Sequence, residues 1–118
     1  MPGIGTDIEE IARFDKLDRV EHKRFLERIY SEDELAYCYS RHSPAQHLAA
    51  RFCAKESVIK ALSILGISGV SYADIRVERD GSAPTVRIAK GSPAAHCKVA
   101  LTMSHGGGLA LAFALAST

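Results

Sequence analysis

The feature that most constrains the fold is one long helical segment, in the middle of the chain, that has almost no polar face. Ser43, Pro44 and Gln46 form a helix start signal, with a hydroxyl cap, a proline at the first helical position and an amide able to bond back to the cap. The segment can run to Leu65, with Gly66 as the natural stop, which is a length of roughly 33 Å. A helix with nowhere polar to face is usually buried, so this segment is predicted to be the central helix.

Charged residues inside such a helix need an explanation. The run RFCAKESVIK, residues 51–60, contains Arg51, Lys55, Glu56 and Lys60 among residues that are mostly apolar or small. Lys55 falls within the apolar stripe, whereas Glu56 and Lys60 stack along one edge of it. Because unpaired buried charges are costly, these side chains either sit at a rim or are held inside for a chemical reason. A surface ion pair of Glu56 with Lys60, beside an extended Lys55, is the alternative.

The amino-terminal segment supplies a second carboxylate. Residues 3–8 are predicted to form a strand, with Asp7 on the same face as Gly3 and Gly5. Asp7 on this strand and Glu56 on a buried helix are the parts needed for a Mg²⁺ site, because Mg²⁺ takes one or two carboxylates together with waters and substrate phosphate oxygens. The alternative is that Asp7 caps a helix that starts near Glu9, and the two roles do not exclude each other.

Neighbouring residues agree with a phosphate-ester site. Lys55 and Lys60 would neutralise the phosphates, while Gly3 and Gly5 would let the substrate approach the backbone. The sequence therefore indicates chemistry on a phosphate ester around Asp7 and Glu56.

Short helices and antiparallel strands are predicted for the rest of the chain. Helical spacing covers residues 9–17 and 21–30, and Ser31 with Glu34 has the form of a capping box that opens a short helix through Tyr39. Strands at 74–79 and 84–89 with a turn at Asp80-Gly81 predict a hairpin. After an irregular or short helical piece at 91–97, two further paired strands flank the glycines at 106–108. Helices segregated from a mostly antiparallel sheet predict an α+β fold.

Composition limits the possible partners. The chain, residues 1–118, fits a single domain, and 15 basic against 14 acidic side chains give no argument for nucleic acid or a membrane surface as a partner. Cys38, Cys53 and Cys97 are odd in number and widely spaced, which favours reduced thiols over a disulfide framework or a zinc site. No signal-peptide pattern or long apolar window is present, so a cytoplasmic location is expected.

Three motifs carry a resemblance to a known family: GIGTDI at 3–8, RFCAKESVIK at 51–60, and a late SH followed by AxAF within 104–113. Together they resemble the holo-[acyl-carrier-protein] synthase family of phosphopantetheinyl transferases. The pairing of GxD with (F/W)xxKExxxK is highly specific, and FLERIYSEDELAYC and GVSYADIRV resemble further family segments in order and spacing. The likeness covers nearly the whole chain.

The resemblance implies the phosphopantetheinyl transferase fold and an enzyme that transfers 4′-phosphopantetheine from coenzyme A to a serine of apo acyl carrier protein. Adenosine 3′,5′-bisphosphate would be released, and the activity would support fatty acid biosynthesis. Asp7 and Glu56 match the Mg²⁺ ligands and Lys60 matches a phosphate contact, which makes these three the expected catalytic residues. Because the nucleophile is the partner's serine, this chain needs no activated Ser or Cys. Glu56 directly, or a metal-bound water, would take the serine proton.

Coenzyme A is expected to contact Arg51, Lys55, Lys60, Ser104 and His105, with His105 near the nucleotide. Ser104 and His105 point to opposite faces of a strand and are badly placed as a nucleophile and its base. The glycines at 106–108 would present amides to an anion, or else form a hairpin turn beside a histidine with its own partner. They stand where the family often has polar or acidic residues, and residues 91–97 look shorter than the family's usual helix, so nucleotide contacts are expected to differ there.

The carrier protein is expected to dock on the first helical region. Residues 13–24 contain five cations and three acids, and Arg13, Arg19 and Arg24 are the predicted contacts, although an ordinary solvated face has a similar composition. The family's small synthases are trimers, and the apolar strand at 109–116 suits either a subunit contact or a buried strand. The alternative function is a non-catalytic module that binds coenzyme A or the carrier. An acetyltransferase is disfavoured because no Q/RxxGxG/A turn is present.

Overall fold

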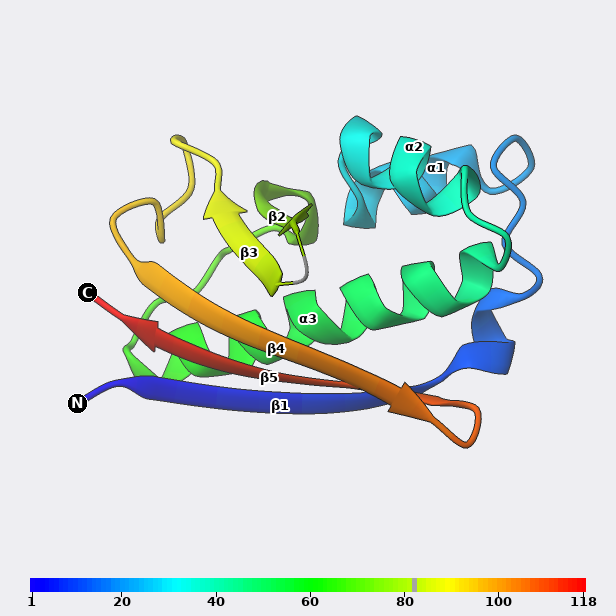
Figure 1. The fold of residues 1–118 in the computed structure, drawn as a ribbon. Helices are drawn as coiled ribbons and strands as arrows, with labels where there is room; N and C mark the ends of the chain where they lie inside the picture. Colours follow the sequence, from blue (N-terminus) through cyan, green and yellow to red (C-terminus); the bar gives the residue numbers. More distant parts are fainter. Residues whose placement is uncertain (82) are drawn as a thin grey trace.

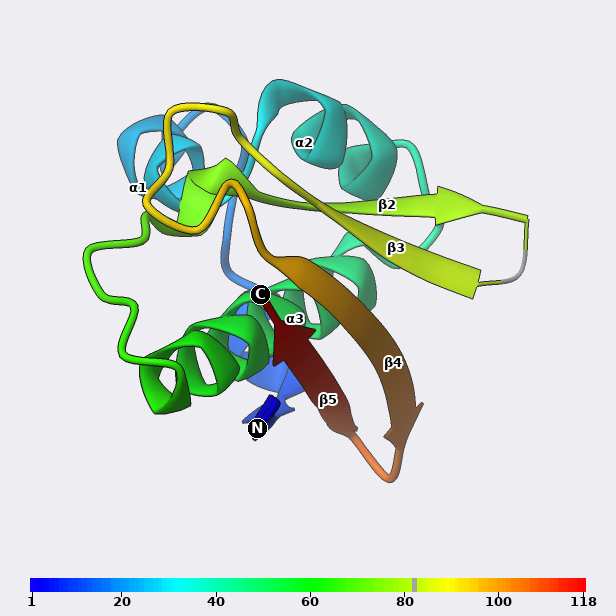
Figure 2. The same ribbon diagram turned by 90° about the vertical axis from the view of Figure 1, so that its left-hand side faces the viewer.

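The computed structural model describes residues 1–81 and 83–118 as an α+β fold around one long helix, α3 (Pro44–Ile64) (Figure 1). An antiparallel sheet in the order β1-β5-β4 lies along one side of α3, formed by β1 (Gly3–Glu10), β5 (Leu109–Ser117) and β4 (Lys98–Gly106). On the other side lie two short helices and an antiparallel hairpin (Figures 1 and 2). These are α1 (Lys23–Ile29), α2 (Glu32–Tyr39), β2 (Ile75–Asp80) and β3 (Ala83–Ile88). The 3₁₀ helices η1 (Ile11–Phe14) and η2 (Tyr72–Asp74) precede α1 and β2.

Most predicted elements are confirmed, and several begin or end at the residues that the sequence indicated. The proline at the start of α3 and the stop at Gly66, whose φ is 79°, lie where the sequence indicates. The capping box that opens α2 is present, since Ser31 and Glu34 bond reciprocally. Residue 82 of the predicted hairpin turn lies outside the described residues.

Two predicted details are wrong. Residues 9–17 do not form an α-helix, because β1 continues to Glu10 through its pairing with β5 and only the turn η1 follows. Ser43 makes no side-chain cap bond at the start of α3. The amide of Gln46 is used elsewhere, with its Nε2 lying 2.9 Å from Nε2 of His105.

Small residues control the approach of α3 to the sheet. A Cβ on Gly3 would lie 1.9 Å from the carbonyl oxygen of Ala61, and one on Gly5 would lie 1.9 Å from that of Ser57. This corrects the expectation that these glycines admit the substrate, because the space over them is filled by the helix backbone. The alanines of β5 face the same way and are buried: Ala110, Ala112, Ala114 and Ala116.

The opposite face of the sheet, here named the outer face, carries large exposed apolar side chains. Its members from β1 and β5 are 39–53% exposed: Ile4, Ile8, Leu109, Leu111, Phe113 and Leu115. A sheet usually buries its large apolar side chains, whereas this one turns them to solvent and packs its alanines on the helix. The outer face is therefore a candidate contact surface.

The described cysteines form no disulfide, and Cys38 and Cys53 are buried. Burial is the main cause that raises the pKa of Cys53 to about 12 and that of Cys38 to about 11, so both stay protonated thiols. Among the described residues, no helix combines the length and apolar character needed to cross a membrane.

Candidate functional site

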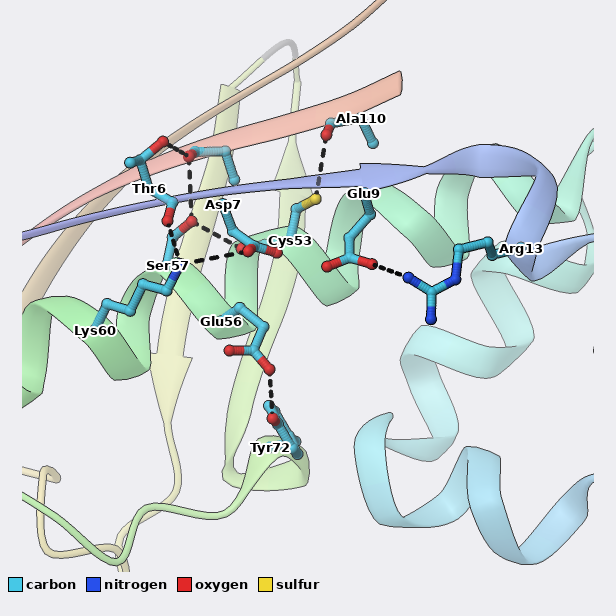
Figure 3. Close-up of polar contacts among 11 residues, drawn as sticks. Thr6, Asp7, Glu9, Arg13, Cys53, Glu56, Ser57, Lys60, Tyr72 and Ala110 are labelled. Atoms are coloured by element: carbon cyan, nitrogen blue, oxygen red, sulfur yellow. Dashed lines mark hydrogen bonds and ion pairs between the residues drawn. The ribbon is translucent and has the colours of Figure 1, made fainter. Parts of the chain in front are cut away.

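The structure brings Asp7, Glu56 and Lys60 together where β1 crosses α3 (Figure 3). The ammonium of Lys60 donates to the carbonyl oxygen of Thr6 at 2.9 Å and lies 3.5 Å from Oδ1 of Asp7. Its side chain is 54% exposed, so the ammonium can also reach an incoming anion. The alternative of a surface ion pair between Glu56 and Lys60 is not the observed arrangement, because Glu56 accepts from Tyr72 and Lys60 contacts Thr6 and Asp7.

Asp7 has an oxygen without a partner. Its side chain is 13% exposed, and Oδ2 is buried with no hydrogen-bond partner among the described residues. A buried carboxylate oxygen that lacks a donor is costly, so the position favours a cation that would satisfy it. The sequence correctly predicted that Asp7 lies on the same face of a strand as Gly3 and Gly5, but it could not show that α3 covers this face and buries the carboxylate.

Glu56 is held by a tyrosine that sequence analysis missed. The hydroxyl of Tyr72, in η2, donates to Oε1 of Glu56 at 2.5 Å (Figure 3). This hydrogen bond is the main cause that raises the pKa of Tyr72 to about 12, followed by burial and by the charges of Glu56 and Asp7. Tyr72 therefore stays a protonated donor. No local pattern pairs residues 56 and 72, although Tyr72 lies in GVSYADIRV, one of the segments that carry the family resemblance.

Glu9 is a third carboxylate of this site that was missed. It lies two residues beyond Asp7 on the same face of β1, and its carboxylate forms an ion pair with Arg13 at 3.8 Å. Burial raises the pKa of Glu9 above its ordinary value, and the charge of Asp7 raises it further. The period-two alternation that places Asp7 would have found Glu9 had the strand been extended to Glu10.

These residues fit a Mg²⁺ ion that is completed by a substrate. Within residues 1–81 and 83–118, no group of three or more His, Cys, Asp or Glu side chains is arranged to hold a metal by itself. Mg²⁺ usually keeps waters and takes one or two carboxylates plus substrate phosphates. Asp7, with its unpartnered Oδ2, and Glu56 are the two carboxylates such an ion would use.

Lys55 does not belong to this group, which corrects the expectation that it contacts phosphate. Its side chain is fully buried, and its ammonium donates to Oε1 of Glu34 at 2.7 Å and to the carbonyl oxygens of Tyr72 and Ile75. Glu34 is also buried and accepts from the backbone N–H of Val77 at 2.9 Å. With all three ammonium protons engaged, Lys55 joins α3 to α2 and to the start of β2, as a structural ion pair.

Arg51, Ser104 and His105 line one cavity of about 390 Å³ at the other end of α3. The side chains of Tyr37, Arg41, Gln46, His47 and Arg79 also line it. Arg51 is only 2% exposed, its guanidinium carbon lies 4.3 Å from the ring centroid of Tyr37, and its Nε has no partner among the described residues.

The electrostatics of this cavity favour an anion. Burial lowers the pKa of His47, and the charges of Arg51, Arg41 and Arg79 lower it further. A buried guanidinium with an unused N–H beside other cations is a site that a phosphate group would neutralise.

The turn after His105 is a hairpin turn. Gly107 and Gly108 both have positive φ, 60° and 80°, and connect β4 directly to β5, as a type I′ turn requires. Ser104 pairs with Leu111 on the outer face, whereas His105 pairs with Ala110 on the face towards α3. Their opposite orientations are confirmed, and a nucleophile with its base is excluded at this pair.

The three arginines predicted to contact a carrier lie in the first helical region. Arg13 and Arg24 are exposed, on η1 and α1. Arg19 is partly covered, forms an ion pair with Glu32 at 2.7 Å and lies over the ring of Tyr39. Val20 and Phe25, which are also exposed, lie in the same region.

Comparisons with known proteins agree with this arrangement. A model of the 4′-phosphopantetheinyl transferase superfamily matches residues 3–114. The holo-[acyl-carrier-protein] synthase of Protochlamydia amoebophila is 39% identical over 122 residues, covering 98% of each chain. Among solved structures, that of Neisseria meningitidis holo-[acyl-carrier-protein] synthase has a TM-score of 0.80 and 28% identity over 98% of each chain. The Helicobacter pylori enzyme in complex with coenzyme A has a TM-score of 0.79 and 32% identity, over 97% of this chain and 99% of that one.

Proposed function

The chain belongs to the holo-[acyl-carrier-protein] synthase family of 4′-phosphopantetheinyl transferases, and on that basis we propose that it transfers 4′-phosphopantetheine from coenzyme A to a serine of apo acyl carrier protein. The relative of known structure that binds coenzyme A supports the choice of donor. The observation that carries the proposal is the group of Asp7, Glu56 and Lys60 at the crossing of β1 and α3.

In the proposed reaction, Oγ of the carrier serine bonds to the phosphorus that bears the pantetheine. The bond from that phosphorus to the bridging oxygen breaks, and this oxygen leaves with adenosine 3′,5′-bisphosphate. The serine proton passes to a base, for which Glu56 is one candidate. The exposed ammonium of Lys60 would stabilise the negative charge on the transferring phosphate.

We propose that this activity depends on Mg²⁺ held by Asp7 and Glu56. When bound, the ion would orient the pyrophosphate and stabilise its developing charge. The unpartnered Oδ2 of Asp7 and the fixed carboxylate of Glu56 support this role.

The cavity lined by Arg51 and His105 is proposed to bind the nucleotide end of coenzyme A. Its buried guanidinium and neighbouring cations suit a phosphate, and the aromatic ring of Tyr37 adds an apolar wall. Arg51, Ser104 and His105 keep their proposed roles as coenzyme A contacts, whereas Lys55 does not.

We further propose that the chain acts as one domain and assembles as a homotrimer through the outer face. The exposed large apolar side chains there support a contact between copies. Arg13, Arg19 and Arg24 would dock the acidic carrier, and modification of that carrier would support fatty acid biosynthesis in the cytoplasm.

Intact-mass analysis of a carrier tests the function. Apo acyl carrier protein incubated with this protein, coenzyme A and Mg²⁺ should gain one phosphopantetheine, and should not gain it when EDTA replaces Mg²⁺. A non-catalytic binding module would instead bind coenzyme A or the carrier without changing the carrier's mass. That result would refute the proposed activity.

A further inference from the structure

The segment that leads into β2 is held to α3 at two consecutive helix residues. The carbonyl oxygen of Tyr72 accepts from the ammonium of Lys55 at 2.9 Å, and the hydroxyl of the same tyrosine donates to Glu56 at 2.5 Å. Tyr72 is therefore fixed at its backbone and at the tip of its side chain. Its ring also packs on Phe52, with the ring centroids 5.6 Å apart.

The backbone end of this arrangement is rigid because it rests on a buried ion pair. Lys55 donates to the carbonyl oxygen of Tyr72, the first residue of η2, to that of Ile75, which follows η2, and to the carboxylate of Glu34. Glu34 in turn accepts from the N–H of Val77 and completes the capping box of α2. Breaking a buried pair is strongly unfavourable, so η2 has little freedom to move away from α3.

The side-chain end acts on the carboxylate that the proposed function assigns to the metal. A hydrogen bond from a hydroxyl to an ionised carboxylate is charge-assisted, and is stronger than one between neutral groups. It occupies Oε1 and leaves Oε2 as the oxygen to present to a cation. Glu56 lies at the edge of the apolar stripe of α3, and its potential partner one turn later, Lys60, is engaged by Thr6 and Asp7.

We propose that Tyr72 is a positioning residue, which orients the carboxylate of Glu56 for the metal and the substrate phosphates and is itself fixed by the Lys55–Glu34 pair. This inference rests on the proposed function. It assigns a role to a residue outside the set found from the sequence. Removing a group that hydrogen-bonds to a metal ligand commonly weakens metal binding by about 10- to 100-fold.

The experiment compares Mn²⁺ affinity, measured by electron paramagnetic resonance of free Mn²⁺ with coenzyme A present, in the wild type and in Tyr72→Phe. This substitution keeps the ring on Phe52 and removes only the hydroxyl. The dissociation constant for Mn²⁺ should rise by about 10-fold or more. In transfer assays the metal concentration for half-maximal rate should rise with it, while the KM for the carrier stays unchanged.

Tyr39→Phe is the matched control, because its hydroxyl donates to the carbonyl oxygen of Leu17 at 2.9 Å, in another part of the fold. It should leave Mn²⁺ affinity unchanged. A Tyr72→Phe protein that binds Mn²⁺ as the wild type does would overturn the inference while leaving the transferase activity standing. A wild type that neither binds Mn²⁺ nor modifies a carrier would overturn the proposed function and this inference with it.

A second comparison asks whether Tyr72 acts through Glu56. In Glu56→Asp, the shortened carboxylate is withdrawn from the hydroxyl, so adding Tyr72→Phe should change Mn²⁺ affinity by less than about 2-fold. If Tyr72→Phe weakened Mn²⁺ binding by about 10-fold both in the wild type and in Glu56→Asp, Tyr72 would not act through Glu56.

Discussion

Replacing Lys55 with methionine separates a structural role from a role in phosphate binding. The substitution removes a fully buried ammonium and three hydrogen bonds, and it leaves the carboxylate of Glu34 buried with only backbone donors from Ser31 and Val77. Removing one partner of a buried pair costs about 3–5 kcal/mol of unfolding free energy. That is a large share of the roughly 5–15 kcal/mol that stabilises an ordinary domain.

Urea denaturation followed by circular dichroism measures this loss. With a slope of about 2 kcal/mol per molar urea, a loss of 4 kcal/mol moves the midpoint down by about 2 M. Both proteins must be compared at one concentration, because a protein that assembles is stabilised by mass action. Lys60→Met is the matched control, since its ammonium is exposed and should contribute no more than about 1 kcal/mol.

The opposite result would refute this account of Lys55. If Lys55→Met lost less than about 1 kcal/mol of stability but bound coenzyme A weakly, the lysine would be a substrate contact, as the sequence alone indicated. The structure predicts the reverse pattern, with Lys55 needed for stability and Lys60 for transfer.

Further predictions concern the surfaces and the cavity. Arg13→Glu combined with Arg24→Glu should chiefly slow association with the carrier and weaken its salt dependence in stopped-flow measurements; unchanged kinetics would remove these residues from the docking surface. Burial lowers the pKa of His47, and the charges of Arg51 and Arg41 lower it further. Just below pH 6.5 the unfolded chain therefore binds a proton at this histidine that the folded protein does not bind. The free energy of unfolding should fall as the pH drops below about 6.5. Adenosine 3′,5′-bisphosphate should raise that pKa in an NMR titration, and a pKa that does not rise would place the anion elsewhere. Phe113→Glu should leave a monomer in light scattering if the outer face joins subunits, and an unchanged mass would exclude that face.

Local sequence signals predicted the elements and part of the site. The proline and glycine that bound α3, the capping box of Ser31 and Glu34, and the glycines between β4 and β5 each act within a few residues, and each is found as expected. The alternation in β1 placed Asp7 correctly, and helical periodicity identified Lys55 as a residue that does not face solvent.

Contacts between distant parts of the chain could not be predicted in this way. β1 lasts to Glu10 because β5, about a hundred residues later, pairs with it along its whole length. The partner of Lys55 is Glu34, which already had a local role in its capping box, so nothing in the sequence indicated a second one. The glycines of β1 are explained by the backbone of α3, which only the packing reveals.

Transfer from coenzyme A is expected to need the carboxylates of both Asp7 and Glu56. The most direct test is an intact-mass time course of apo acyl carrier protein with coenzyme A and Mg²⁺, using the wild type, Asp7→Asn and Glu56→Gln. We expect modification by the wild type and a loss of at least about 100-fold in rate for each variant, with the fold of both variants intact by circular dichroism. Modification by either variant at the wild-type rate would show that its carboxylate is not needed for transfer.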